Sequence, residues 1–269
     1  MKTAVLMLAA VALTAGAALP VSARAQTVAR TGDRTPPAPA VTAGAPIAVC
    51  PLDSGFVIDN GGLTRSRAAV RAGQLRILAV GSSSIEGIGA SRRELGFAPL
   101  LESGLEQRLP GVDVSVLNRG IGGETAKETA DRLERELAAG RVDLVIWQLG
   151  TNDVLRDRAF DDVFADFHRG EAALKAADVD VLLIDPQRLP EETANAGFRG
   201  RNPTLETMAR RIADEGRRGG YAVLRRFDAM AGWSGLDRGG VGPDDLHLND
   251  AGYACWAEVT AEGLAPRLR

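Results

Sequence analysis

A run of three serines stands directly after a short apolar stretch. Residues 75–80 read "LRILAV" and residues 81–87 read "GSSSIEG". An apolar run of this kind predicts a strand, and a turn that follows a strand exposes its hydroxyl groups at the edge of a sheet. A serine in that place can act as a nucleophile when a general base lies within reach.

Three other uses of such a turn do not fit its spacing. A phosphate-binding P-loop requires its second glycine where Glu86 stands, with a lysine after it. The dinucleotide-binding motif requires a glycine at Arg92, and the nucleophile elbow of α/β-hydrolases requires one at Ile85. What remains is a strand-to-helix turn that carries a hydroxyl group.

A base for that hydroxyl has to be one of only two histidines. His168 lies in an amphipathic stretch that predicts a helix, and we expect it to serve on the surface or in packing. His247 follows Asp244 by three residues in a predicted loop. At that spacing a carboxylate on a tight turn reaches the imidazole Nδ1, fixes the tautomer and stabilises the imidazolium ion. His247 is therefore the candidate base.

Five apolar runs alternate with helical patterns along the chain. The predicted strands are residues 75–80, 112–118, 142–149, 179–185 and 221–227, and the predicted helices are 94–109, 125–139, 159–177, 203–218 and 250–264. This alternation predicts an α/β fold whose mostly parallel sheet is covered by helices on both faces. Two polar segments, "NRGIGGET" (118–125) and "GTND" (150–153), follow the second and third strands. Sites in such sheets form at the carboxyl ends of the strands, so we expect the polar segments to meet at one edge.

Taken together, the serine turn, the two polar segments and Asp-x-x-His resemble the four blocks of the SGNH (GDSL-type) serine hydrolases, in the same order across residues 75–250. The resemblance implies a three-layer α/β/α sandwich with a flavodoxin-like five-stranded parallel sheet. It implies Ser83 as the nucleophile, Asp244 and His247 as the rest of the triad, and an oxyanion hole formed by Ser83, Gly123 and Asn152. The implied activity is that of a carboxylic ester hydrolase that works through an acyl-serine and needs no metal or cofactor.

The first block departs from the family pattern, because Ser82 stands where the family has aspartate. Gly87 lies four residues after Ser83, which is the family's spacing from nucleophile to glycine, and this alignment selects Ser83 among the three serines. We expect the turn to be braced differently without the carboxylate. Ser84 is expected to cap the helix that follows.

The first 25 of the 269 residues have the three-part layout of a secretory signal, with a lysine, an apolar run from residue 4 to 19 and small residues before a cleavage point after Ala25. The run is too short for a membrane-spanning helix and is broken by Gly16 and Pro20. Residues 26–49 are rich in proline and alanine and predict a flexible lead, so residues 50–269 form the hydrolase domain. We expect a secreted or periplasmic protein.

Charge and cysteine content bound the remaining options. Cleavage changes the net charge from −3 to −5, which gives no electrostatic footprint for nucleic acid. Cys50 and Cys255 are the only cysteines. In an export context they can form a disulfide between the chain ends, and two buried thiols are the alternative. Two cysteines and two histidines indicate no zinc site.

Two polar loops, 186–202 and 229–243, are expected to border the site. They contain arginine, glycine and acids, with Phe198 and Trp233 as isolated large apolar groups. A long acyl chain needs an apolar groove, so these loops favour a short acyl ester, such as an O-acetyl group on a carbohydrate. If the loops are only solvated connections, the acyl preference stays open. The alternatives are a lipid or aryl esterase, a thioesterase, an acyltransferase, or an inactive glycan-binding member; the chain's oligomeric state is not indicated.

Overall fold

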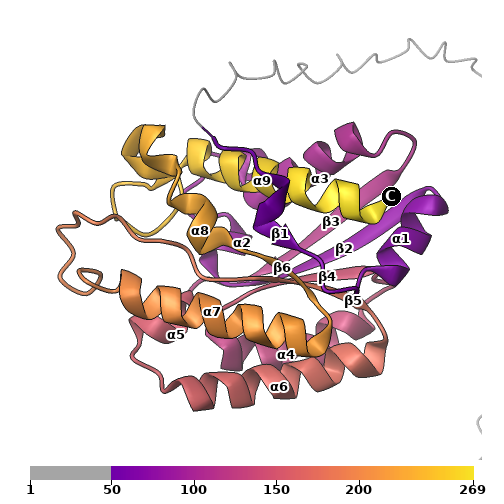
Figure 1. Cartoon of the computed structure of the whole chain (residues 1–269), viewed down its shortest axis with the longest axis horizontal. Helices are drawn as coiled ribbons and strands as arrows, with labels where there is room; N and C mark the ends of the chain where they lie inside the picture. Colours follow the sequence, from indigo (N-terminus) through magenta and orange to yellow (C-terminus); the bar gives the residue numbers. More distant parts are fainter. Residues whose placement is uncertain (1–49) are drawn as a thin grey trace, which may run out of the picture. The chain divides into compact units, whose positions relative to one another are not determined.

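The structure is a computed structural model and describes residues 50–269 (Figure 1). The signal peptide and the flexible lead, which were predicted for residues 1–49, lie outside the described residues.

A sheet of six strands forms the centre of the domain, in the order β1-β6-β5-β4-β2-β3. Five of the strands are parallel: β2 (Gln74–Gly81), β3 (Asp113–Gly120), β4 (Leu144–Gln148), β5 (Asp180–Ile184) and β6 (Ala222–Leu224). Their order is the flavodoxin-like order, which confirms the predicted parallel sheet. The short strand β1 (Val57–Ile58) pairs antiparallel with β6 at the edge and was not predicted.

Helices cover both faces of this sheet, as Figure 1 shows. One face packs against α1 (Thr64–Arg71), α3 (Phe97–Arg108) and α9 (Asp250–Leu268), and the other against α4 (Ala126–Ala138), α6 (Phe160–Ala177) and α7 (Asn202–Gly219). Alternate residues of a strand point to opposite faces. In β2, Ile77 and Ala79 therefore join one core, and Leu78 and Val80 join the other. The predicted three-layer α/β/α sandwich is confirmed.

Short helices follow three of the parallel strands at their carboxyl ends. They are α2 (Ser83–Glu86), α5 (Thr151–Leu155) and α8 (Arg226–Met230). Single turns of 3₁₀-helix lie at Ser54–Phe56, Arg93–Leu95, Trp233–Gly235 and Asp237–Gly240.

Three element boundaries differ from the sequence prediction by three residues or more, and one of them is the end of α9, which lies at Leu268 instead of residue 264. The strand expected over 221–227 ends at Leu224, because the N–H of Arg225 donates to the Phe56 carbonyl (2.8 Å) and α8 begins at Arg226. The helix expected from residue 94 begins at Phe97, after the 3₁₀ turn.

Cys50 and Cys255 form a disulfide that spans 205 residues of sequence, with Cα atoms 5.6 Å apart. The bond ties the start of the described domain to the buried face of α9. It confirms the hypothesis of a bond between the chain ends and excludes the two free thiols that the sequence had left open.

Loss of the Cys50–Cys255 disulfide should strongly destabilise the domain. Closing so long a loop restricts the unfolded chain and adds about 5 kcal/mol in the chain-entropy model. We expect a marked fall in the unfolding midpoint on reduction, measured by urea titration with and without reductant. The Cys50→Ala/Cys255→Ala double variant is the control and should not respond to reductant. Equal midpoints for oxidised and reduced wild type would contradict this expectation.

Asp185 directly follows β5, and its carboxyl group is buried. Burial raises the pKa of this carboxyl to about 8, and the hydrogen bond that Oδ1 accepts from the Phe227 N–H (2.9 Å) offsets only part of the shift. The folded state therefore binds the proton more tightly than the unfolded state. The stabilising contribution is complete below the unfolded pKa of about 4 and is lost as the pH rises through about 8.

Asp185→Asn should remove this dependence, because the amide stays neutral and its oxygen still accepts from the Phe227 N–H. Between pH 5 and pH 9 the free energy of unfolding of wild type should fall relative to that of the variant. The measurement is urea titration of both proteins at pH 5, 7 and 9. Asp214→Asn, at an exposed carboxylate on α7, is the control. Parallel curves for wild type and Asp185→Asn would show that the expectation is wrong.

None of the helices within residues 50–269 has both the length and the apolar character that crossing a membrane requires.

Candidate active site

The serine turn and both polar segments lie at one edge of the sheet. β2, β3 and β4 are parallel neighbours that end at Gly81, Gly120 and Gln148, so the loops after them share the carboxyl edge. The Asp244–His247 turn packs against the same place: a Cβ atom added to Gly89 would lie 2.9 Å from the His247 Cβ. The fold therefore gathers the four segments that the sequence had singled out.

Ser83 is the first residue of α2 and is nearly buried, with 9% of its surface exposed. The helix lasts one turn and ends at Gly87, which adopts a left-handed conformation (φ 100°) that glycine accommodates without strain. A Cβ atom added to Gly122 would stand 4.0 Å from the Ser83 Cβ. The loop after β3 thus passes directly beside the serine.

Ser82 fills the position of the family's aspartate and uses an amide as its partner. Its N–H and its hydroxyl group both donate to Oε1 of Gln148, at 3.1 and 3.0 Å. Gln148 is the last residue of β4, so this pair of bonds joins the serine turn to the neighbouring strand. The turn is braced by a neutral group in place of a carboxylate.

Ser84 does not cap α2, which corrects the expectation from the sequence. The N-cap position belongs to Ser82, so Ser84 already lies inside the helix. Its side chain is buried, and its hydroxyl group lies 3.3 Å from Oε1 of Gln187.

Two hydrogen bonds hold the loop that carries Gly123. Nη2 of Arg156 donates to the Gly123 carbonyl (2.7 Å), and Nδ2 of Asn152 donates to the Glu124 carbonyl (2.9 Å). Gly123 itself has a positive φ of 81°. Among residues 50–269, the main-chain N–H groups of Ser83 and Gly123 donate to no protein acceptor. Both groups are therefore available as hydrogen-bond donors.

Asn152 is oriented by its place in α5. That helix starts after Gly150, whose φ of 96° turns the chain sharply out of β4. One proton of the Asn152 amide binds Glu124, which leaves the second proton for a ligand. The next residue, Asp153, is buried and accepts a hydrogen bond from the N–H of Ala126 (3.1 Å). This bond joins segment 150–153 to the residue directly after segment 118–125.

Asp244 and His247 form the pair that their spacing predicts. The His247 Nδ1 lies 2.5 Å from Oδ2 of Asp244. The other carboxylate oxygen accepts the N–H groups of Leu246 (3.1 Å) and His247 (3.0 Å). Partial burial acts to raise the pKa of Asp244, but the bonds from the His247 ring and from these N–H groups outweigh it and lower the pKa. The carboxylate stays ionised and fixes Nδ1 as the protonated nitrogen, so Nε2 is free to accept a proton.

His168 lies outside the site. It is exposed on α6, where its Nε2 lies 3.2 Å from a carboxylate oxygen of Glu215 on α7. The expectation of a surface role is confirmed.

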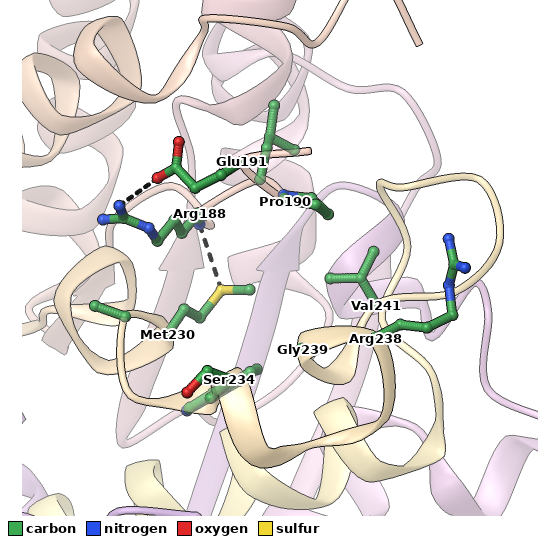
Figure 2. A pocket seen from close by; sticks show the side chains of 11 residues that line it. Arg188, Pro190, Glu191, Met230, Ser234, Arg238, Gly239 and Val241 are labelled. Atoms are coloured by element: carbon green, nitrogen blue, oxygen red, sulfur yellow. Dashed lines mark hydrogen bonds and ion pairs between the residues drawn. The ribbon is translucent and has the colours of Figure 1, made fainter. Parts of the chain in front are cut away.

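The two loops that were expected to border the site enclose a hollow of about 270 Å³, which Figure 2 shows. The Arg188 guanidinium group pairs with Glu191 (2.5 Å). The main-chain nitrogen of Arg188 lies 3.4 Å from the Met230 sulfur. On the opposite wall, Arg238 pairs with Asp245 (2.8 Å). Asp245 is the sequence neighbour of Asp244. Every residue of the wall comes from the two loops: Arg188, Leu189, Pro190, Glu191, Met230, Ala231, Trp233, Ser234, Arg238, Gly239 and Val241.

The sequence did not single out the two glutamines that join the segments of the site. Gln148 offered one signal, as a polar residue at the carboxyl end of an otherwise apolar strand. Gln187 offered none beyond its position after β5. Within residues 50–269, no group of three or more histidine, cysteine or acidic side chains is arranged to hold a metal ion.

A family model described as the non-GDSL lipase-like family matches residues 49–251. The chain belongs to this family. The matched residues include the serine turn, both polar segments and the Asp244–His247 turn. A search of curated proteins finds no match.

Solved structures similar to the non-GDSL lipase-like chain include esterases. TesA superposes with a TM-score of 0.60 at 25% identity, over 71% of this chain and 98% of TesA. A two-domain esterase active on acetylated mannans has a TM-score of 0.61 at 25% identity, over 81% of this chain and 57% of its own length. The chain thus spans little more than half of that protein. An acetylxylan esterase from Geobacillus stearothermophilus shares the fold at 18% identity, with a TM-score of 0.55 over 69% of this chain and 91% of that one.

These relationships confirm the resemblance to SGNH hydrolases. The non-GDSL lipase-like chain is a carboxylic ester hydrolase of the SGNH type.

Proposed function

We propose that Ser83, His247 and Asp244 act as a catalytic triad that hydrolyses short acyl esters through an acyl-serine. The observation that carries the proposal is the Asp244–His247 pair, with Nδ1 and Oδ2 2.5 Å apart, packed at Gly89 against the turn that holds Ser83. A carboxylate-bound imidazole, in a turn that packs against the segment after Ser83, supplies the general base that nucleophilic catalysis by a serine requires.

In the proposed mechanism His247 acts as a base and then as an acid in each half-reaction. Nε2 of His247 takes the Ser83 proton as Oγ attacks the ester carbonyl, and the imidazolium then gives that proton to the departing alcohol. The N–H groups of Ser83 and Gly123 and the Asn152 amide stabilise the oxyanion, each donor being worth about 10²–10³ in rate. Nε2 of His247 then takes a proton from a water molecule as the water attacks the acyl-serine, and it gives that proton to Ser83 Oγ as the acid leaves.

The substrate that we propose is an O-acetyl or similarly short ester on a carbohydrate. The hollow between the two loops gives partial support: four of its eleven lining residues, Arg188, Glu191, Ser234 and Arg238, have charged or hydroxyl groups, while none of the proposed catalytic residues lines it. Such groups suit a hydroxylated ligand better than a long alkyl chain. The mannan-directed activity of the two-domain esterase is a second support.

One feature favours a longer acyl group as the alternative. Ile88 and Ile121 are 41% and 48% exposed. The N–H of Ile88 donates to the Ser83 carbonyl (3.0 Å), and Ile121 precedes Gly122 in the loop beside the serine. Two exposed isoleucines close to the nucleophile are suited to contact an alkyl chain, as in a lipid esterase or thioesterase.

An acyl-length series separates the two substrates. We expect kcat/KM on p-nitrophenyl esters to be highest for acetyl and to fall toward decanoyl, and we expect acetate release from acetylated mannan or xylan. Ser83→Ala is the control for both assays. A steady rise in kcat/KM toward decanoyl, which Ile88→Ser and Ile121→Ser abolish, would replace the acetyl ester by a lipid-like substrate.

Export is part of the proposal. The Cys50–Cys255 disulfide supports it, because such bonds persist in oxidising compartments. A mature protein that begins at Gln26, determined by N-terminal sequencing, is the expected mark of signal cleavage.

A further inference from the structure

Gln187 contacts three of the segments that carry the proposed catalytic groups, although it belongs to none of them. It lies in the loop after β5 and is 1% exposed. Its Oε1 accepts hydrogen bonds from the hydroxyl of Ser84 (3.3 Å) and from Nη2 of Arg226 (3.1 Å). Its Nε2 donates to the Leu246 carbonyl (2.5 Å), and its main-chain N–H donates to the Thr151 hydroxyl (3.3 Å).

Each of three partners is the sequence neighbour of a proposed catalytic group. Ser84 follows the nucleophile, Leu246 precedes the base, and Thr151 precedes the oxyanion donor Asn152. Arg226, the fourth partner, is not next to any of these groups. A single buried side chain thus has the nucleophile turn on one end of its amide and the histidine turn on the other.

The orientation of the Gln187 amide is determined by Arg226. A guanidinium group can only donate hydrogen bonds, so Oε1 has to face Arg226, and Nε2 has to face the Leu246 carbonyl. Arg226 is fully buried, and its guanidinium carbon lies 4.0 Å from the centre of the Trp256 ring. Trp256 in turn stacks on Phe97 with ring centres 3.8 Å apart. Nη2 of Arg226 also donates to the Ser84 hydroxyl (3.4 Å), so a rotated amide would cost this buried cation the shorter of its two hydrogen bonds.

We propose that Gln187 is a positioning residue that sets the distance between Ser83 and His247 by holding the Ser84 hydroxyl and the Leu246 carbonyl on opposite ends of one amide. The inference depends on the proposed triad and is independent of the natural substrate. Gln187 is buried and does not touch the substrate. Its loss should therefore lower kcat, by up to about 10²-fold for a misplacement near 1 Å, and should leave KM nearly unchanged.

Two variants separate positioning from stability. Gln187→Met keeps the shape of the side chain and loses its hydrogen bonds, so both kcat and the unfolding midpoint should fall. Gln187→Glu keeps an acceptor for Arg226 and gains an ion pair, but it turns an oxygen toward the Leu246 carbonyl. We expect Gln187→Glu to unfold no earlier than wild type and yet to lose at least about tenfold in kcat. Ser84→Ala removes only one hydroxyl group, and its kcat should fall by a smaller factor.

Asn60→Ala is the matched control. The Asn60 amide donates to the Tyr221 carbonyl (2.8 Å), just before β6 at the opposite edge of the sheet. This variant should lower the unfolding midpoint and leave kcat unchanged.

The readout is the rate of inactivation by a fluorophosphonate, together with kcat and KM on p-nitrophenyl acetate and the unfolding midpoint of each variant. Slower inactivation of folded Gln187→Glu, with Asn60→Ala at the wild-type rate, supports the inference. A wild-type rate for Gln187→Glu or for Ser84→Ala would overturn it. If wild type itself does not react at Ser83, the proposed function fails instead, so the two failures are distinguishable.

Discussion

Ser83→Ala and His247→Ala should each remove nearly all esterase activity, by about 10⁶-fold in kcat if the triad acts as one unit. In the proposed triad the serine provides the atom that becomes acylated, and the histidine provides the base that takes its proton. Because neither group works without the other, the double variant should be no slower than either single variant. The measurement is kcat on p-nitrophenyl acetate for the three variants.

A matched control and a labelling experiment accompany this prediction. His168→Ala removes a histidine that also pairs with a carboxylate, that of Glu215, and it should retain wild-type activity. A fluorophosphonate should label Ser83 alone, as located by peptide mass mapping. Label on Ser82 or Ser84 that survives in Ser83→Ala would reassign the nucleophile, and a normal rate for His247→Ala would overturn the mechanism.

Asp244→Asn is expected to cost up to about 10⁴-fold in kcat, as the same change does in serine proteases. The reason lies in the two N–H groups, from Leu246 and His247, that bind Oδ1 of Asp244. They hold the amide oxygen of an asparagine in that place and turn its NH₂ group toward Nδ1. That nitrogen then has to accept a hydrogen bond, so Nε2 carries the proton and cannot take another from Ser83.

Asp244→Ala is the informative comparison. It removes all three hydrogen bonds but imposes no tautomer. If the wrong tautomer causes the loss, the asparagine variant should be at least as slow as the alanine variant, with KM little changed in both. A clearly faster Asp244→Asn would show that Asp244 acts through hydrogen-bond number and charge instead.

The residue pattern alone determined the main elements and the candidate groups of this protein. Periodicity and turn chemistry are properties of short segments, so the five parallel strands and the larger helices followed from local sequence. The Asp244–His247 hydrogen bond was also local, because three residues on one turn bring the two side chains together. The order of the four blocks carried the resemblance to the SGNH family, and that resemblance implied the strand order.

Tertiary structure decided what depends on contacts between distant segments. Ser82 meets Gln148 across 66 residues, Ser84 meets Gln187 across 103, and Cys50 meets Cys255 across 205. No local pattern selects such partners, because each pair depends on how whole strands and helices pack. The end of β6 at Leu224 has the same origin: residues 221–227 read as one strand, and the contact of Arg225 with Phe56 and the burial of Arg226 against Trp256 turn the chain into a helix.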